Sequence, residues 1–211
     1  MSLRTGHTTK ASLVRFDAVE RTAHWISAAM ILVLIVTAIP LYFGSLFGLL
    51  VPRFACEQVH LWVGLALPVP LLAGALGPWG ARLRRDVARV NAWTRAEISW
   101  LTSWGRIEIE GDKFNPGQKL NAVVVASSSV VLLGSGVVLK WFRYFPLSWR
   151  AGSTFVHDLV AWLLVVVILG HVAMALTHRQ ALLSMLRGRV SEEWAARHAS
   201  RWLAESRPDR E

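Results

Sequence analysis

The stretch STFVHDLVAWLLVVVILGHVAMALTH, residues 153–178, is long and apolar enough to cross a bilayer, yet it contains His157 and His171. In a helix these two residues lie about 21 Å apart along the axis. Fourteen residues make nearly four turns, so both side chains project from the same face. An ionisable group at membrane depth is costly and usually faces a partner, a cavity or a cofactor. This helix therefore predicts candidate sites at two depths.

The whole chain has the composition of a membrane protein. Of its 211 residues 54% are hydrophobic, and its mean hydropathy is +0.40. Asp, Glu, Lys and Arg are absent from residues 22–52, 58–81, 120–139 and 159–178. Each stretch is about as long as a helix needs to cross the hydrocarbon layer, where only helices satisfy the backbone of such runs.

We therefore expect an all-α membrane protein, a four-transmembrane-helix bundle formed by residues 1–211 as a single domain. The expected spans are about 23–44, 57–78, 119–141 and 153–177, with a cytoplasmic segment 82–118 and a cytoplasmic C-terminal tail 179–211. Of the 23 Lys and Arg residues, 19 lie before the first span, between the second and third, or after the fourth. The positive-inside rule then predicts that both termini are cytoplasmic.

The net charge of +9 follows from this topology, because the basic residues, from Arg4 to Arg210, flank the spans. We therefore expect membrane lipid and no nucleic acid among the partners. Cys56 is the only cysteine, which excludes a disulfide within the chain and cysteine-ligated iron–sulfur clusters. Without a Cys-x-x-Cys-His motif, covalent haem attachment is excluded as well.

Local patterns refine this expectation. Pro68 and Pro70 should break the second span. Within 82–112, apolar residues at helical spacing indicate an amphipathic helix on the cytoplasmic face. Ser191 is a candidate N-cap for a surface helix in the tail. Asp158 could orient an imidazole or mark a helix N-terminus, and we favour the second interpretation. Small residues over 127–136 favour either close helix packing or room for a planar cofactor.

Four of the seven histidines lie within or at the ends of expected spans. The topology places His24 and His171 in an inner layer and His60 and His157 in an outer layer. Two b-type haems, each held by two axial imidazoles, would explain matched pairs at two depths. Zinc prefers four ligands, and a proton relay would not need matched pairs. The remaining histidines, His7, His178 and His198, we assign to aqueous or interfacial positions.

Haem propionates are anionic and should lie near the membrane surfaces. Arginines beside the two layers are the hypothetical partners: Arg15 and Arg21 inside, Arg53 or Arg150 outside.

Three stretches resemble the cytochrome b (gamma) subunit of membrane-bound formate dehydrogenases: RFDAVERTAHWISA at 15–28, KFNPGQKLN at 113–121 and GSTFVHDLVAWLLVVVILGHVAMALTH at 152–178. The resemblance runs along essentially the whole chain. It implies a subunit of the bacterial inner membrane that anchors an iron–sulfur (beta) subunit. Through that subunit it would also anchor a molybdenum- or tungsten-containing catalytic (alpha) subunit. The complex could form a higher oligomer. Electrons would pass through the outer and then the inner haem to quinone.

The same resemblance implies a quinone pocket at the turn before the third span, formed by Asn115, Gly117, Gln118 and His171. Asn and Gln offer hydrogen-bond donors, and glycine permits a close backbone approach. From the sequence alone, an ordinary Asn-Pro-Gly turn that leads into a helix explains the same residues. Whether menaquinone or ubiquinone binds is open.

Other functions stay open at this point. A free-standing dihaem cytochrome could oxidise a small outer-face donor such as superoxide, and the cytochrome b subunit of a hydrogenase or thiosulfate reductase shares the group's pattern. A transporter or an assembly protein with buried histidines is a third class. The chain would carry a quinone site but no formate site.

Overall fold

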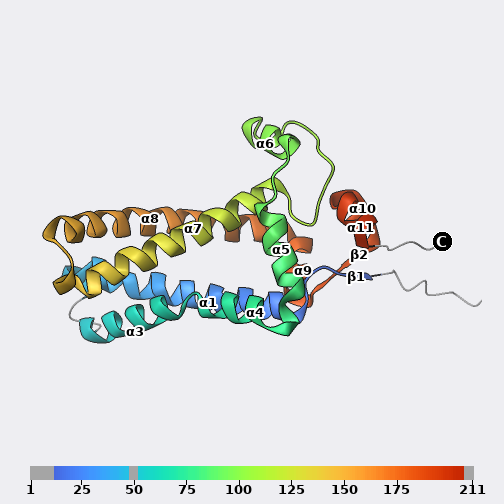
Figure 1. Ribbon diagram of the computed structural model, residues 1–211. Helices are drawn as coiled ribbons and strands as arrows, with labels where there is room; N and C mark the ends of the chain where they lie inside the picture. The colour runs from blue at the N-terminus through green and yellow to red at the C-terminus, as the bar shows by residue number, and fades with distance from the viewer. Residues whose placement is uncertain (1–11, 48–51, 207–211) are drawn as a thin grey trace, which may run out of the picture.

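The fold is seen in a computed structural model that describes residues 12–47 and 52–206. Arg4, His7, Lys10 and Arg210 lie outside the described residues. A long helical bundle forms one part of the molecule, and a group of short helices and strands gathers at one of its ends (Figure 1).

Four helices are long and apolar enough to cross a membrane, as the sequence predicts. They are α1 (Ala18–Tyr42), α3 with α4 (Arg53–Ala66 and Val69–Leu76), α7 (Pro116–Lys140) and α8 (Leu147–Thr177). In the apolar window of each span only 6–11% of the residues are buried. Since most of these apolar side chains face outward, the bundle needs lipid around it, and the protein is a multi-pass membrane protein.

The bundle consists of two hairpins. α1 packs on α3 and α4, and α7 packs along α8 (Figure 1). At the far end the chain turns through the short helices α2 (Gly44–Phe47) and η2 (Phe142–Tyr144). Between the hairpins, direct backbone contact is sparse in the described ranges: α3 approaches α7 over a short length, and α1 has little contact with α8.

The second span is broken where the sequence predicts. Helix α3 ends at Ala66, and α4 starts at Val69, directly after Pro68. The backbone N–H of Leu67 bonds the carbonyl oxygen of Gly64 at 3.3 Å, a tighter turn than an α-helix makes. Proline has no backbone N–H to donate to the preceding turn, so the hydrogen-bond pattern of α3 stops and a new helix, α4, begins.

The fourth span begins earlier than its apolar run. Helix α8 starts at Leu147, after Pro146, and not near 153. Asp158 consequently lies about three turns inside α8, and our interpretation of it as the marker of a helix N-terminus is wrong. The start follows proline, which is well suited to the beginning of a helix and gives no hydropathy signal.

The segment after the second span forms two helices and not one. After η1 (Pro78–Gly80), α5 covers Ala81–Asn91 and α6 covers Arg95–Thr102. The expected single amphipathic helix is interrupted because Thr94 is the N-cap of α6. The Thr94 hydroxyl accepts a hydrogen bond from the Glu97 backbone N–H, and the Glu97 carboxylate accepts one from the Thr94 backbone N–H. This reciprocal capping box fixes a new helix start.

The C-terminal part begins with α9 (Arg179–Arg187), which ends at Gly188 in the left-handed conformation, φ +80°. Strand β2 (Arg189–Ser191) then pairs antiparallel with β1 (Ser12–Val14), with Leu13 opposite Val190. Ser191 caps α10 (Glu192–His198), as predicted. The expected single helix is again divided, because α11 (Ser200–Ser206) starts anew after Ala199.

We call the group formed by α5, α6, residues 103–115, α9, β1, β2, α10 and α11 the polar cap. Its small apolar core contains Val190, Ala195, Ala199 and Trp202. Buried ion pairs tie it to the bundle: Lys119, at the start of α7 and only 1% exposed, donates from Nζ to Glu97 Oε1 at 2.6 Å and to the Ala92 carbonyl at 2.9 Å.

Replacing Lys119 by methionine should therefore loosen the cap. Removal of one partner leaves the Glu97 carboxylate buried without its cation, which costs about 3–5 kcal/mol. We expect much faster backbone hydrogen exchange in residues 95–102. The control is Lys140→Met, which removes the exposed pair with Glu57 (3.1 Å) and should cost less than about 1 kcal/mol. Equal effects of the two variants on the exchange of 95–102 would contradict this role.

Candidate functional site

The four span histidines meet in two pairs, and each pair takes one imidazole from each hairpin. The cap-side pair is His24 of α1 with His171 of α8, whose ring centroids are 6.3 Å apart with an interplanar angle of 58°. The distal pair is His60 of α3 with His157 of α8, at 6.4 Å and 59°. Both pairs therefore span the space between the hairpins, and α8 contributes to both.

These separations suit one metal ion between two imidazoles. The metal–nitrogen bond is about 2.0 Å and the nitrogen lies about 1.2 Å from its ring centroid, so opposite ligands on one ion have centroids about 6.4 Å apart. Stacked imidazoles in direct contact would be much closer. Each pair thus has the spacing of two axial ligands.

Hydrogen bonds at Nδ1 orient three of the four rings. Nδ1 of His60 lies 3.0 Å from the Thr37 hydroxyl oxygen, and Nδ1 of His157 lies 3.0 Å from the Ser135 hydroxyl oxygen. A bond at Nδ1 leaves Nε2 as the nitrogen that can bind a metal, and such partners fix the ring orientation.

The third ring, His171, has its Nδ1 3.3 Å from the side-chain amide of Asn121. Since a metal-bound imidazole donates from Nδ1, the amide oxygen of Asn121 would be the acceptor in the metal-bound state. This contact joins α7 to the cap-side pair.

The donor set fits a haem better than a bare ion. Within the described residues, no group of three or more His, Cys, Asp or Glu side chains comes together. Two imidazoles alone do not complete a coordination shell, whereas a porphyrin supplies the equatorial nitrogens and leaves two axial positions. Gly136 of α7 lies beside the distal pair, where a Cβ would be in ordinary van der Waals contact with Cε1 of His157, at 3.5 Å.

The turn before α7 is built by a second capping box. Asn115 Oδ1 accepts from the Gln118 backbone at 2.8 Å, and Gln118 Oε1 accepts from the Asn115 backbone at 3.1 Å. In the described part of the chain, neither side-chain NH₂ group of this pair has a protein acceptor. Gly117 lies inside the turn, where a Cβ would come within 3.3 Å of Asn115 Oδ1. The turn thus has a structural role and still offers two free donors.

The same turn lies close to the cap-side pair. Gln118 and Asn121 are three residues apart on α7, on neighbouring positions of one helix face. Because Asn121 contacts His171, the predicted residues of the turn lie about one to two helical turns along α7 from the residue that contacts His171.

Arg15 is held by the protein and is not free at the surface. It is 3% exposed; its terminal nitrogens donate to the Ser184 hydroxyl (3.2 Å) and the Lys113 carbonyl (2.7 Å). Its guanidinium also lies over the rings of Phe16 and Trp194, at 5.1 and 4.7 Å. Arg15 is therefore a structural tie between the bundle and the cap.

The other arginines that we considered for propionates are more accessible. Arg21 and Arg53 each donate one terminal nitrogen to a backbone carbonyl, and Arg150 lies over an aromatic ring. Each has further N–H donors for an anionic group.

We did not assign three residues of the site from the sequence, which are Thr37, Ser135 and Asn121. Thr37 and Ser135 also bond carbonyls of their own helices, at 2.8 Å to Val33 and 2.7 Å to Val131. A hydroxyl in an apolar helix ordinarily makes only this bond to a carbonyl of its own helix. These residues could be found from the sequence only by their position on the helix face that points toward a histidine of another helix. That face is not known until it is known which helices pack together.

A four-helix membrane bundle that holds histidine pairs between its two hairpins has the layout of a membrane cytochrome of the b type. The match to a family model agrees: residues 15–188 fit the family described as prokaryotic cytochrome b561, and the chain belongs to this family. Membership implies b-type haem and a role in electron transfer.

Curated relatives cover nearly the full chain. The cytochrome b556(fdo) subunit of formate dehydrogenase from Escherichia coli K12 is 28% identical over 209 residues, which is 93% of this chain and 94% of that protein. The nitrate-inducible cytochrome b556(Fdn) subunit of the same strain is 26% identical, covering 92% and 91%. A formate dehydrogenase cytochrome b556 subunit of Haemophilus influenzae is 23% identical, covering 92% and 83%.

Proposed function

We propose that this chain is the membrane-anchoring electron-transfer subunit of a formate dehydrogenase complex. It passes electrons from an iron–sulfur subunit through two bis-histidine b haems, the distal one first, to quinone near the cytoplasmic face. The observation that carries the proposal is the pair of imidazole separations, 6.3 and 6.4 Å, at two depths between the hairpins. The near full-length similarity to formate dehydrogenase cytochrome subunits supports the choice of complex.

The proposed ligands are His24 and His171 for the cap-side haem and His60 and His157 for the distal haem. When bound, each haem supplies a one-electron carrier whose axial positions are both filled. The protein contributes ring orientations through Thr37, Ser135 and Asn121. Arg21 at the cap side and Arg53 or Arg150 at the distal side remain the candidates for the propionates.

The polar cap lies in the cytoplasm of a bacterial cell in this proposal, because most Lys and Arg residues belong to it or flank it. The distal end then faces the periplasm, where an iron–sulfur subunit with its molybdenum or tungsten partner would dock. Formate would release its protons outside, and quinone would take up protons inside, so the reaction would separate charge across the membrane.

Quinone would bind at the turn that starts α7. The free amide donors of Asn115 and Gln118 can bond a quinone carbonyl, and Gly117 leaves room for a close approach. His171, through Asn121, lies at the same level as this turn. The chain would hold the quinone beside the cap-side haem, where electrons arrive.

The complex purified from its native membrane tests this function. Formate should reduce the b-type absorption band within the time of one enzyme turnover, and added quinone should then oxidise it again. Iron–sulfur and molybdenum or tungsten subunits should co-purify. Reduction of the band by hydrogen, or oxidation of the reduced band by thiosulfate, with no response to formate, would assign the chain to a different complex.

The quinone turn can be tested without disturbing its cap. Asn115→Asp and Gln118→Glu keep the oxygen acceptors of the capping box and remove the amide donors. We expect each variant to raise the quinone KM by about tenfold, since a hydrogen bond of about 1.4 kcal/mol corresponds to that factor. Haem content should not change. Wild-type KM values in both variants would mean that the residues only cap the helix.

A further inference from the structure

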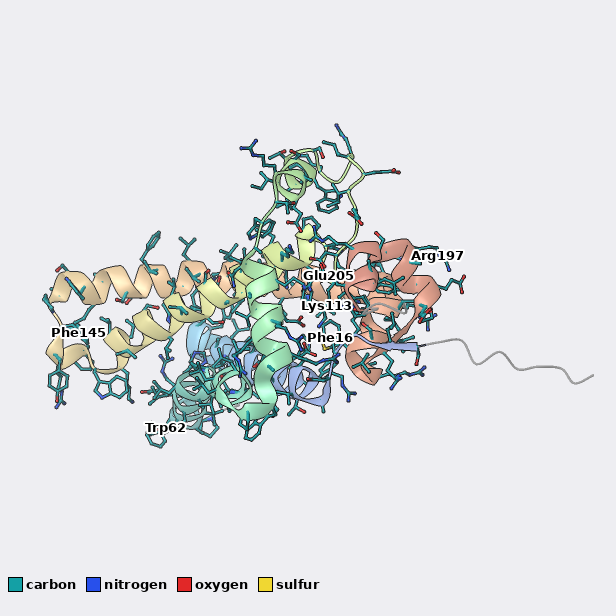
Figure 2. All side chains as sticks on the ribbon, turned by 45° about the vertical axis from the view of Figure 1, so that its right-hand side comes forward. Phe16, Trp62, Lys113, Phe145, Arg197 and Glu205 are labelled. Carbon is teal, nitrogen blue, oxygen red and sulfur yellow. The ribbon has the colours of Figure 1, made fainter. Side chains whose placement is uncertain are left out.

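Three buried charged residues form a cluster where the bundle meets the polar cap. Lys113 Nζ donates to Glu20 Oε1 at 3.2 Å and to Asp86 Oδ2. The three side chains come from α1, from α5 and from the segment before α7, which are far apart in the sequence. Figure 2 shows Lys113 at this junction beside Phe16, whose ring lies 4.9 Å from Nζ.

All three side chains of the cluster are buried, and Asp86 is the most exposed of them. Side-chain exposure falls from 11% at Asp86 through 7% at Lys113 to 4% at Glu20. Glu20 lies one helical turn before His24 on α1, on the same helix face. Lys113 lies two residues before Asn115. The inner end of the cluster is therefore near both the cap-side histidine pair and the proposed quinone turn.

The charges around Asp86 keep a proton available near neutral pH. Burial raises the pKa of the Asp86 carboxyl to about 7, the neighbouring Glu20 carboxylate acts in the same direction, and Lys113 opposes both. The Arg15 guanidinium also interacts electrostatically with Asp86. A carboxyl with this pKa gains and loses protons at cellular pH.

Asp112 is a second buried aspartate of the cap, and its surroundings lower its pKa where those of Asp86 raise it. Burial would raise its pKa, but hydrogen bonds from Arg201 and from the Lys113 backbone, with the charge of Arg89, hold the pKa below its usual range. Asp112 is thus a permanently ionised structural partner. The two aspartates have similar burial and different chemistry.

Stability alone does not account for the Glu20–Lys113–Asp86 cluster. A buried ion pair is often no more stable than well-packed apolar residues of the same volume. Beside the cluster, the Nε–H of Arg15 is buried without an acceptor among the described residues. An unsatisfied buried donor of this kind marks a place for an ordered water, which could extend a hydrogen-bonded chain.

We infer that Asp86, Lys113 and Glu20 form a proton relay between cytoplasmic water and the quinone turn. The inference rests on the proposed function. Reduction of one quinone to quinol takes two electrons, which the iron–sulfur partner supplies through the haems, and two protons. For each proton, Lys113 Nζ passes one to the Glu20 carboxylate, which gives it up toward the quinone oxygen. Asp86 then returns a proton to Lys113 and takes one from cytoplasmic water. The relay ends each cycle in its starting protonation state.

The test uses the intact complex, with its haems reduced by a stoichiometric amount of dithionite and then mixed with a soluble quinone. In the wild type, the rate of haem re-oxidation should fall as the pH rises through about 7, because Asp86 loses its proton there. Asp86→Asn should slow re-oxidation at least tenfold at pH 7, a modest effect for a positioned proton donor, and should abolish this pH step. Asp86→Glu should restore it.

Asp112→Asn is the matched control and should leave the rate and its pH step unchanged. Haem spectra equal to the wild type show that the variants fold. Glu20→Gln tests the inner end independently, because glutamine keeps a side-chain oxygen that can accept from the Asp17 backbone N–H at the start of α1. If Asp86→Asn and Glu20→Gln both behave like the wild type, the relay is overturned while quinone reduction stands. If quinone does not re-oxidise the wild-type haems, both the relay and the proposed function are overturned.

Discussion

The separation of two imidazoles across the bundle, a little over 6 Å in both pairs, is the constraint on which the rest of the structure depends. It is too long for direct contact and suits a single ion between two nitrogens. Each pair joins one hairpin to the other, while the backbones of α1 and α8 have little contact of their own. In the proposed function, metal ligation would therefore connect the two halves as well as carry electrons, and haem binding would be coupled to folding.

The polar cap solves a different problem. The ends of α1 and α7 carry unpaired N–H groups, and capping boxes at Asp17 and Asn115 satisfy some of them. Buried ions then fix the cap to these helix starts: Lys119 reaches the start of α6, and Lys113 joins α1 to α5. The cap thereby holds the turn of Asn115, Gly117 and Gln118, which we propose binds quinone, at the cap end of the bundle. One structural layer serves both anchoring and, as we infer, proton supply.

The sequence predicted what depends on composition and helical period. Charge-free runs gave the four spans, prolines gave the break at Pro68, and the helical repeat put His157 and His171 on one face. It could not give what depends on pairing between distant segments. The three-residue strands β1 and β2 have no periodic signal, and their residues are about 177 positions apart. Thr37 and Ser135 act through contacts that exist only after helices meet, as do the partners of Lys113.

The coordination of the iron tests the central claim most directly. Electron paramagnetic resonance of the oxidised complex, with haem quantified per chain, reports both the number of haems and their axial ligands. Two low-spin bis-imidazole signals are predicted, one lost in His157→Ala and the other in His171→Ala. The control is His178→Ala, at the residue that follows α8, which should keep both signals. A high-spin ferric signal in the unmodified protein, or fewer than two haems per chain, would contradict the account.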